Sequence, residues 1–136
     1  MHNITLIPGD GIGPEITDAV KAVIDAAGVA VQWDVQQVGE KAIKEYGNPL
    51  PEPAIDSIKY NKVALKGPVT TQVGTGFKSI NVTLRQTFDL YANIRPVKSL
   101  PGTKTLYKDI DMVIFRENTE DLYAGIENVI DEDRVE

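Results

Sequence analysis

The chain has 136 residues, enough for one domain of ordinary size, and its 42% hydrophobic and 25% charged residues are usual for a globular protein. A net charge of −6 argues against nucleic acid or an anionic membrane surface as the main partner, because both require a basic face. The sequence has no cysteine, which excludes disulfides and thiolate metal sites, and no apolar run approaches the roughly 20 residues of a membrane-spanning helix.

Strand and helix patterns alternate through the first half of the chain. The apolar run 4–7 predicts a buried strand, and apolar residues then recur at helical spacing from Ile16 to Ala27. Pro14 suits the start of this helix and Gly28 its end. Further patterns predict a strand at 29–35, a weaker helix at 39–46, a short helix at 51–60 and a short strand at 63–65.

The second half continues the alternation with a less regular pattern. Ile80, Leu84 and Phe88 are four apart and predict a helix. A strand at 90–94 that stops at Pro96, a polar connection at 98–109 and a buried strand at 112–115 follow. This order indicates an α/β fold with a largely parallel sheet, and a domain seam, if there is one, is expected near 96–102.

Two loops that follow predicted strands are candidate ligand sites. The loop 9–15 enters a helix, whose N-terminus attracts anions, and glycines would let its backbone approach a ligand. It is not the dinucleotide fingerprint, because Pro14 stands where that motif needs a glycine, and a tight structural turn is the alternative. The loop 66–76 bears hydroxyl groups and follows the next strand, although a solvated loop would have the same composition.

Three of the chain's four arginines, Arg85, Arg95 and Arg116, fall in one part of the sequence. Arginine binds carboxylates through two parallel hydrogen bonds, so this group predicts a pocket for a small molecule with several carboxylates. The alternative for Arg116, which ends a predicted buried strand, is an ion pair with a nearby acidic residue.

Three polar residues accompany these arginines. Asn81 and Arg85 are four apart, so they share one face of the predicted helix. Ser79 stands at the start of that helix, where a simple cap is the alternative to a ligand contact. Tyr123 is a candidate proton donor, with a packing aromatic as its alternative.

Four segments together resemble the isocitrate and isopropylmalate dehydrogenase family, and they lie in the family's order and spacing along the whole chain. They are Leu6–Glu15, Lys66–Thr71, Ser79–Arg85 and Phe115–Gly125. The resemblance implies an isopropylmalate dehydrogenase-like α/β fold. It assigns residues 1–98 to the N-terminal part of the large domain and residues 99–136 to the start of the small domain, leading toward the clasp region.

The resemblance also implies a reaction, the oxidative decarboxylation of isocitrate to 2-oxoglutarate. Ser79 and Asn81 are polar, as in the isocitrate enzymes, where isopropylmalate enzymes offer an apolar patch. Homoisocitrate, tartrate and 3-isopropylmalate are the alternative substrates, and a non-catalytic regulatory subunit or fragment that binds isocitrate or citrate is the alternative role.

By the same resemblance, Ser79, Asn81, Arg85, Arg95 and Arg116 are substrate-binding residues and Tyr123 is catalytic. Ile12 and Thr70 match positions that contact the cofactor, which is NAD, or NADP as the alternative. Mg2+ or Mn2+ is the expected metal, with its ligands outside this chain.

Family members are much longer than this chain, so the resemblance is to their N-terminal portion only. We therefore expect the isolated chain to be inactive and to leave a sheet edge and apolar surface uncovered. The complete enzyme is expected to be a homodimer or homo-oligomer. Its expected location is the cytoplasm, or the mitochondrial matrix in a eukaryote.

Overall fold

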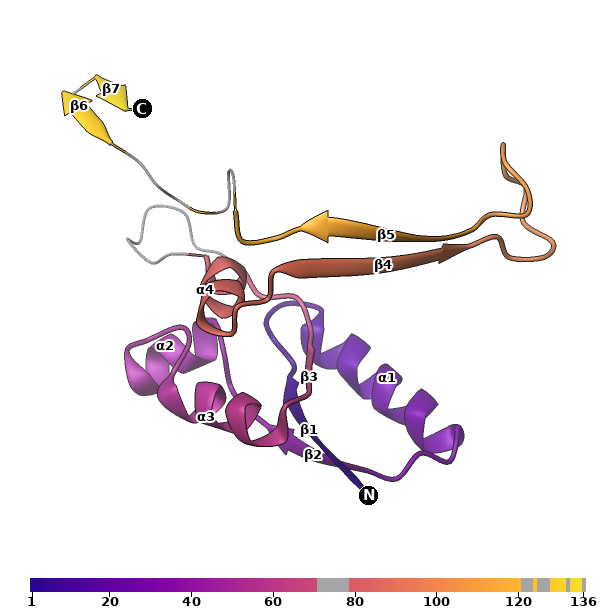
Figure 1. Cartoon of the computed structure of the whole chain (residues 1–136). Coiled ribbons are helices and arrows are strands. Elements are labelled where there is room, and N and C mark those ends of the chain that lie inside the picture. The colour runs from indigo at the N-terminus through magenta and orange to yellow at the C-terminus, as the bar shows by residue number, and fades with distance from the viewer. Residues whose placement is uncertain (71–78, 121–123, 125–127, 132, 136) are drawn as a thin grey trace. The chain divides into compact units, whose positions relative to one another are not determined.

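The computed structural model of the chain is shown in Figure 1, and it describes residues 1–70, 79–120, 124, 128–131 and 133–135. These residues form two compact units, Met1–Asn81 and Val82–Glu136. None of the described helices is both long and apolar enough to cross a membrane.

The first unit is built on a parallel sheet of three strands, β1 (His2–Ile7), β2 (Val31–Val35) and β3 (Ala64–Lys66). Their order is β2-β1-β3, with Leu6 of β1 opposite Val35 on one side and Leu65 on the other. The central strand is buried from Thr5 to Ile7, as the apolar run predicts. The strand predictions for this unit are therefore confirmed, each within a few residues of its bounds.

Three helices complete the first unit: α1 (Gly13–Ala26), α2 (Glu40–Tyr46) and α3 (Glu52–Asn61). The connection from β1 to β2 moves toward one side of the sheet, and the connection from β2 to β3 returns past β1 to the other side. Because such connections are right-handed, α1 and α3 lie on opposite faces of the sheet, as Figure 1 shows. The described core of this unit includes Leu6, Ile7, Val38, Ala42, Leu50 and Ala54.

The second unit contains an antiparallel ribbon of β4 (Ala92–Lys98) and β5 (Asp111–Glu117). A helix, α4 (Ile80–Thr87), spans the boundary between the units, and two short strands, β6 (Val129–Asp131) and β7 (Arg134–Val135), pair with each other. These strands are antiparallel, so among the described residues the predicted parallel sheet lies in the first unit. The predicted division of the chain at residue 98 stays a prediction.

Two details of the ribbon correct the sequence analysis. β4 does not stop at Pro96 but continues to Lys98, with Pro96 opposite Val113. A proline is tolerated in a strand that has an outer edge, because no partner there needs its N–H. β5 is exposed along its whole length rather than buried, with Phe115 at 71% of its full exposure. An apolar run predicts burial only if another layer covers the strand, and a two-stranded ribbon does not supply that layer by itself.

Candidate functional site

The loops that follow β1, β2 and β3 meet at one edge of the parallel sheet, because parallel strands end on the same side. The backbone N–H of Gln36 donates to the carbonyl of Leu6 at 2.8 Å, and that of Gly67 donates to the carbonyl of Ile7 at 2.7 Å. These bonds align the residues that follow β2 and β3 with the end of β1, so the three loops begin at the same edge of the sheet. The cluster formed by residues 8–13, 36–40 and 67–70 is called the carboxyl-edge loops below.

Three glycines of the carboxyl-edge loops have a structural purpose. A Cβ on Gly9 would overlap the carbonyl oxygen of Pro68, and one on Gly13 or on Gly67 would overlap the carbonyl oxygen of Pro8. These glycines let one backbone pack directly on another. The alternative of a tight structural turn therefore accounts for them without any ligand.

Gly11 differs from these three glycines. Its φ is +58°, and a Cβ there would meet no atom within 4 Å, so the space beside it is open. The next residue, Ile12, is 67% exposed although it is large and apolar. This part of the loop therefore presents an exposed apolar side chain beside open space.

Ile12 and Thr70, the two predicted cofactor positions, belong to the same loop cluster. Both side chains are exposed. The N–H of Thr70 donates to the Oδ2 atom of Asp10 at 3.2 Å, and Asp10 is two residues before Ile12. The structure thus brings together two residues that are far apart in the sequence, although their contact with a cofactor stays a prediction.

Helix α4 has polar and apolar faces next to each other. Ile80 and Leu84 are buried, four residues apart, so they define the packed side of the helix. Asn81 and Arg85 each follow one of these residues and are half-buried. Ser79 lies just before the helix and is half-buried too. Asn81 and Arg85 therefore share a face of α4, as the spacing predicts.

Two of the predicted arginines share one face of the ribbon. Arg116 lies opposite Asn93, and Asn93 and Arg95 are two residues apart on β4. Residues that are directly paired on neighbouring strands point to the same face of a sheet, and so do residues two apart on one strand. All three side chains therefore lie on one face of the ribbon. The Nε–H of Arg95 donates to Oδ1 of Asn93 at 3.2 Å. Arg95 and Arg116 are exposed, so the expected burial at the end of β5 is corrected.

The sequence analysis missed a buried residue next to this face. Asn118 is only 5% exposed, and its Nδ2 donates to the carbonyl of Leu90 at 2.8 Å. This bond closes the end of the ribbon at which Arg116 lies. Within the described part of the chain, its Oδ1 has no hydrogen-bond partner. Nothing in its sequence context distinguishes it from a surface asparagine.

Glu117 shapes the turn that follows β5. Its Oε1 accepts hydrogen bonds from the backbone N–H groups of Thr119, at 2.7 Å, and Glu120, at 2.9 Å. These bonds lower the pKa of the Glu117 carboxyl from its ordinary value, the bond from Thr119 having the largest effect. Glu117 is therefore ionised at neutral pH, and its carboxylate holds the turn at Thr119 and Glu120.

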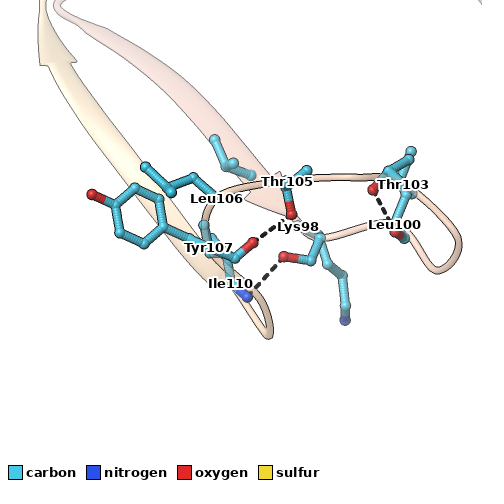
Figure 2. Close-up of a pocket in the computed structure, with 9 residues that line it drawn as sticks. Lys98, Leu100, Thr103, Thr105, Leu106, Tyr107 and Ile110 are labelled. Carbon is cyan, nitrogen blue, oxygen red and sulfur yellow. Dashed lines mark hydrogen bonds between the residues drawn. The ribbon is translucent and has the colours of Figure 1, made fainter.

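A hollow lies at the end of the ribbon opposite to Arg116 and is shown in Figure 2. It has a volume of about 360 Å³ and is lined mainly by apolar side chains, including Val97, Leu100, Leu106 and Ile110. The connection around it is held by hydrogen bonds, among them Ile110 N–H to Ser99 Oγ at 2.9 Å. It contains no arginine and is not the site that the sequence predicts.

The predicted site is placed only in part. Tyr123 lies outside the described residues. Ser79 and Asn81 are in the first unit and the three arginines in the second, so the expected common pocket stays a prediction. Among the described residues, no group of three or more His, Asp or Glu side chains could hold a metal ion.

Comparisons with known proteins cover nearly the whole chain. The model of the isocitrate/isopropylmalate dehydrogenase family matches residues 3–136. The probable alpha subunit of the mitochondrial NAD isocitrate dehydrogenase of Drosophila melanogaster is 51% identical, with 93% of this chain and 34% of that protein covered. A regulatory subunit of the mitochondrial NAD isocitrate dehydrogenase of Dictyostelium discoideum is 48% identical, with 94% and 34% covered.

Solved structures also resemble the chain over its whole length or nearly so. The crystal structure of isocitrate dehydrogenase from Methylococcus capsulatus superimposes with a TM-score of 0.87 and 55% identity, covering 100% of this chain and 41% of that one. The α/β fold is thus that of part of an isocitrate dehydrogenase structure. The chain spans about a third of the length of the curated relatives described above.

Proposed function

The chain belongs to the isocitrate/isopropylmalate dehydrogenase family, and on this basis we propose that it serves the oxidative decarboxylation of isocitrate to 2-oxoglutarate with reduction of NAD. It would form the substrate-binding part of the enzyme. NADP is the alternative cofactor.

The observation that supports this proposal most directly is the shared ribbon face of Arg95 and Arg116. Two guanidinium groups on one face can each bind a carboxylate through parallel hydrogen bonds and so fix the orientation of a polycarboxylate. The polar residues Ser79 and Asn81 beside Arg85 suit a third carboxylate better than an apolar group. Isocitrate has three carboxylates.

In the proposed mechanism, the chain's own residues bind, orient and move a proton. Arg85, Arg95 and Arg116 hold the substrate carboxylates and so fix the C2 carbinol, while Ser79 and Asn81 contact the third carboxylate. When bound, the nicotinamide supplies a hydride acceptor and Mg2+ or Mn2+ a Lewis acid, the metal ligands lying outside this chain. Tyr123 gives a proton to the carbon that carbon dioxide leaves.

Ile12 and Thr70 are the residues proposed to contact the cofactor. The open space beside Gly11 and the exposure of Ile12 fit an apolar contact with a ring, and Thr70 adds a hydroxyl at the same edge. The complete enzyme would assemble from several subunits, since the relatives described above are named as subunits. It would act in the cytoplasm, or in the mitochondrial matrix of a eukaryote.

A regulatory role is the second candidate, because one relative at 48% identity is named a regulatory subunit. Such a protein would bind isocitrate or citrate without turnover. Homoisocitrate, tartrate and 3-isopropylmalate are the alternative substrates of an active enzyme.

Calorimetric titration of this chain with isocitrate, citrate, homoisocitrate, tartrate and 3-isopropylmalate tests the proposal. We expect isocitrate to bind more tightly than 3-isopropylmalate, whose isopropyl group would face Ser79 and Asn81. Tighter binding of 3-isopropylmalate would reject the isocitrate assignment. NAD(P)H formation by this chain with isocitrate and Mg2+ would show that a proton acceptor and a metal site lie within it, contrary to our expectation of an inactive chain.

A further inference from the structure

Asp10 joins three separate loops at the carboxyl edge of the sheet. Its Oδ1 accepts a hydrogen bond from the N–H of Glu40 at the start of α2, and its Oδ2 accepts one from the N–H of Thr70, both at 3.2 Å. The N–H of Asp10 itself donates to the carbonyl of Pro68 at 2.9 Å. One residue thus connects the loops that follow β2 and β3 to the loop that follows β1.

Gly39 allows this close approach. Its φ is +89°, and a Cβ at this position would overlap the carboxyl group of Asp10. Any other L-residue would therefore be strained and would also displace Asp10. Because Gly39 is adjacent to Glu40, the same glycine brings one of the two donors within reach of the carboxylate.

Both carboxylate oxygens are needed for this arrangement. Each accepts from a backbone N–H of a different loop, so the side chain at position 10 must present two acceptors. An asparagine has the same shape, but it would direct an NH2 group at one of the donors. Substitution by asparagine therefore removes one connection without removing volume.

We propose that Asp10 is a positioning residue that holds the loop of Thr70 against the loop of Ile12 and so forms one cofactor-contacting surface. The inference rests on the proposed function, in which Ile12 and Thr70 contact the nicotinamide cofactor. Asp10 itself is turned toward the protein, with both oxygens bonded to backbone N–H groups. It acts on the cofactor only through the two loops.

The test compares Asp10→Asn with the parent chain and with Asp18→Asn. Asp18 is an exposed residue of α1 that pairs only weakly with Lys21, at 3.5 Å, so its variant is a matched control for the change of charge.

NMR gives the rates of amide hydrogen exchange at Glu40 and Thr70, and it also gives the response of the spectrum to NAD+. We expect exchange at both amides to become about tenfold faster in Asp10→Asn. NAD+ binding should weaken about tenfold, because the surface loses its preorganisation. The control should match the parent.

Unchanged exchange at Glu40 and Thr70 would overturn the proposal, and so would faster exchange with unchanged NAD+ binding. A parent chain that does not respond to NAD+ would instead overturn the proposed cofactor contacts, while the exchange rates would still show whether Asp10 joins the loops. If Asp10→Asn does not fold, Gly39→Ala disturbs the same bond from the other side. It should accelerate exchange at the same two amides, and parent-like exchange there would contradict the proposal.

Discussion

At the scale of single residues, the arginines of the ribbon provide the most direct test of the proposed substrate. Lysine keeps the charge of an arginine but cannot form the two parallel hydrogen bonds to a carboxylate. We expect Arg95→Lys and Arg116→Lys each to weaken isocitrate binding about tenfold, a loss of about 1.4 kcal/mol measured by calorimetry. Arg134→Lys is the matched control, since Arg134 lies on β7, which is not a strand of the ribbon, and pairs with Asp131 of β6. An equal loss in all three variants would show that the effect is not specific to the ribbon, and it would contradict the proposed site.

A second prediction at the residue scale concerns a chain of hydrogen bonds between α3 and the sheet. Ser57 donates to Asp34 at 2.6 Å, so its single proton is used and Thr5 must donate to Ser57, at 2.7 Å. Asn61 donates to Thr5 at 2.9 Å. The bond from Ser57, followed by that from Gln36, lowers the pKa of Asp34 below its ordinary value of 3.8, although burial opposes the shift.

This shift makes the stability of the first unit depend on pH. Because the pKa of Asp34 is lower in the folded state than in the unfolded state, its contribution is fully present above about pH 4 and is lost as the pH falls through the folded value. We expect Asp34→Asn to lower the free energy of unfolding by about 1–3 kcal/mol at pH 7, measured by urea denaturation. As the pH falls below about 4, the difference in the free energy of unfolding between the two proteins should narrow. A difference that does not change with pH would contradict this account.

At the scale of elements, the carboxyl-edge loops depend on glycines that pack backbone against backbone. Gly67→Ala would place a methyl group on the carbonyl oxygen of Pro8, which cannot move without shifting β1. We expect a loss of about 1–3 kcal/mol in the free energy of unfolding, measured in urea. Gly47→Ala is the comparison, since Gly47 has a φ of +68° but open space around it. Its loss should be about 1 kcal/mol, from the backbone conformation alone. A smaller loss for Gly67→Ala than for Gly47→Ala would contradict the packing argument.

At the scale of the whole chain, the described residues leave much apolar surface exposed. Ile94 and Phe115 on the ribbon, Leu106 in its connection and Val23 on α1 are each more than half exposed. Surfaces of this kind usually bind another polypeptide. We expect the isolated chain to bind a dye specific for apolar surface and to self-associate in light scattering as concentration rises. A compact monomer that binds no dye would contradict this expectation.

The amino-acid sequence was sufficient to predict the order of the elements in the first unit and the family. Hydrophobic periodicity is a local property, so β1, α1, β2, α2, α3 and β3 could be located from it, and motifs at fixed spacing identified the family without any coordinates. It also predicted that Asn81 and Arg85 share a face of α4, because residues four apart do so in any helix.

Which residues act together depends on the tertiary structure. Arg95 and Arg116 share a face because β4 and β5 pair antiparallel in one register, which no local pattern specifies. β5 was predicted to be buried but is exposed, because the burial of a strand depends on whether another layer covers it. The bonds from Asp10 to Glu40 and Thr70 join residues 30 and 60 positions apart. Such bonds arise from the close packing of the loops, and that packing exists only once the sheet has formed.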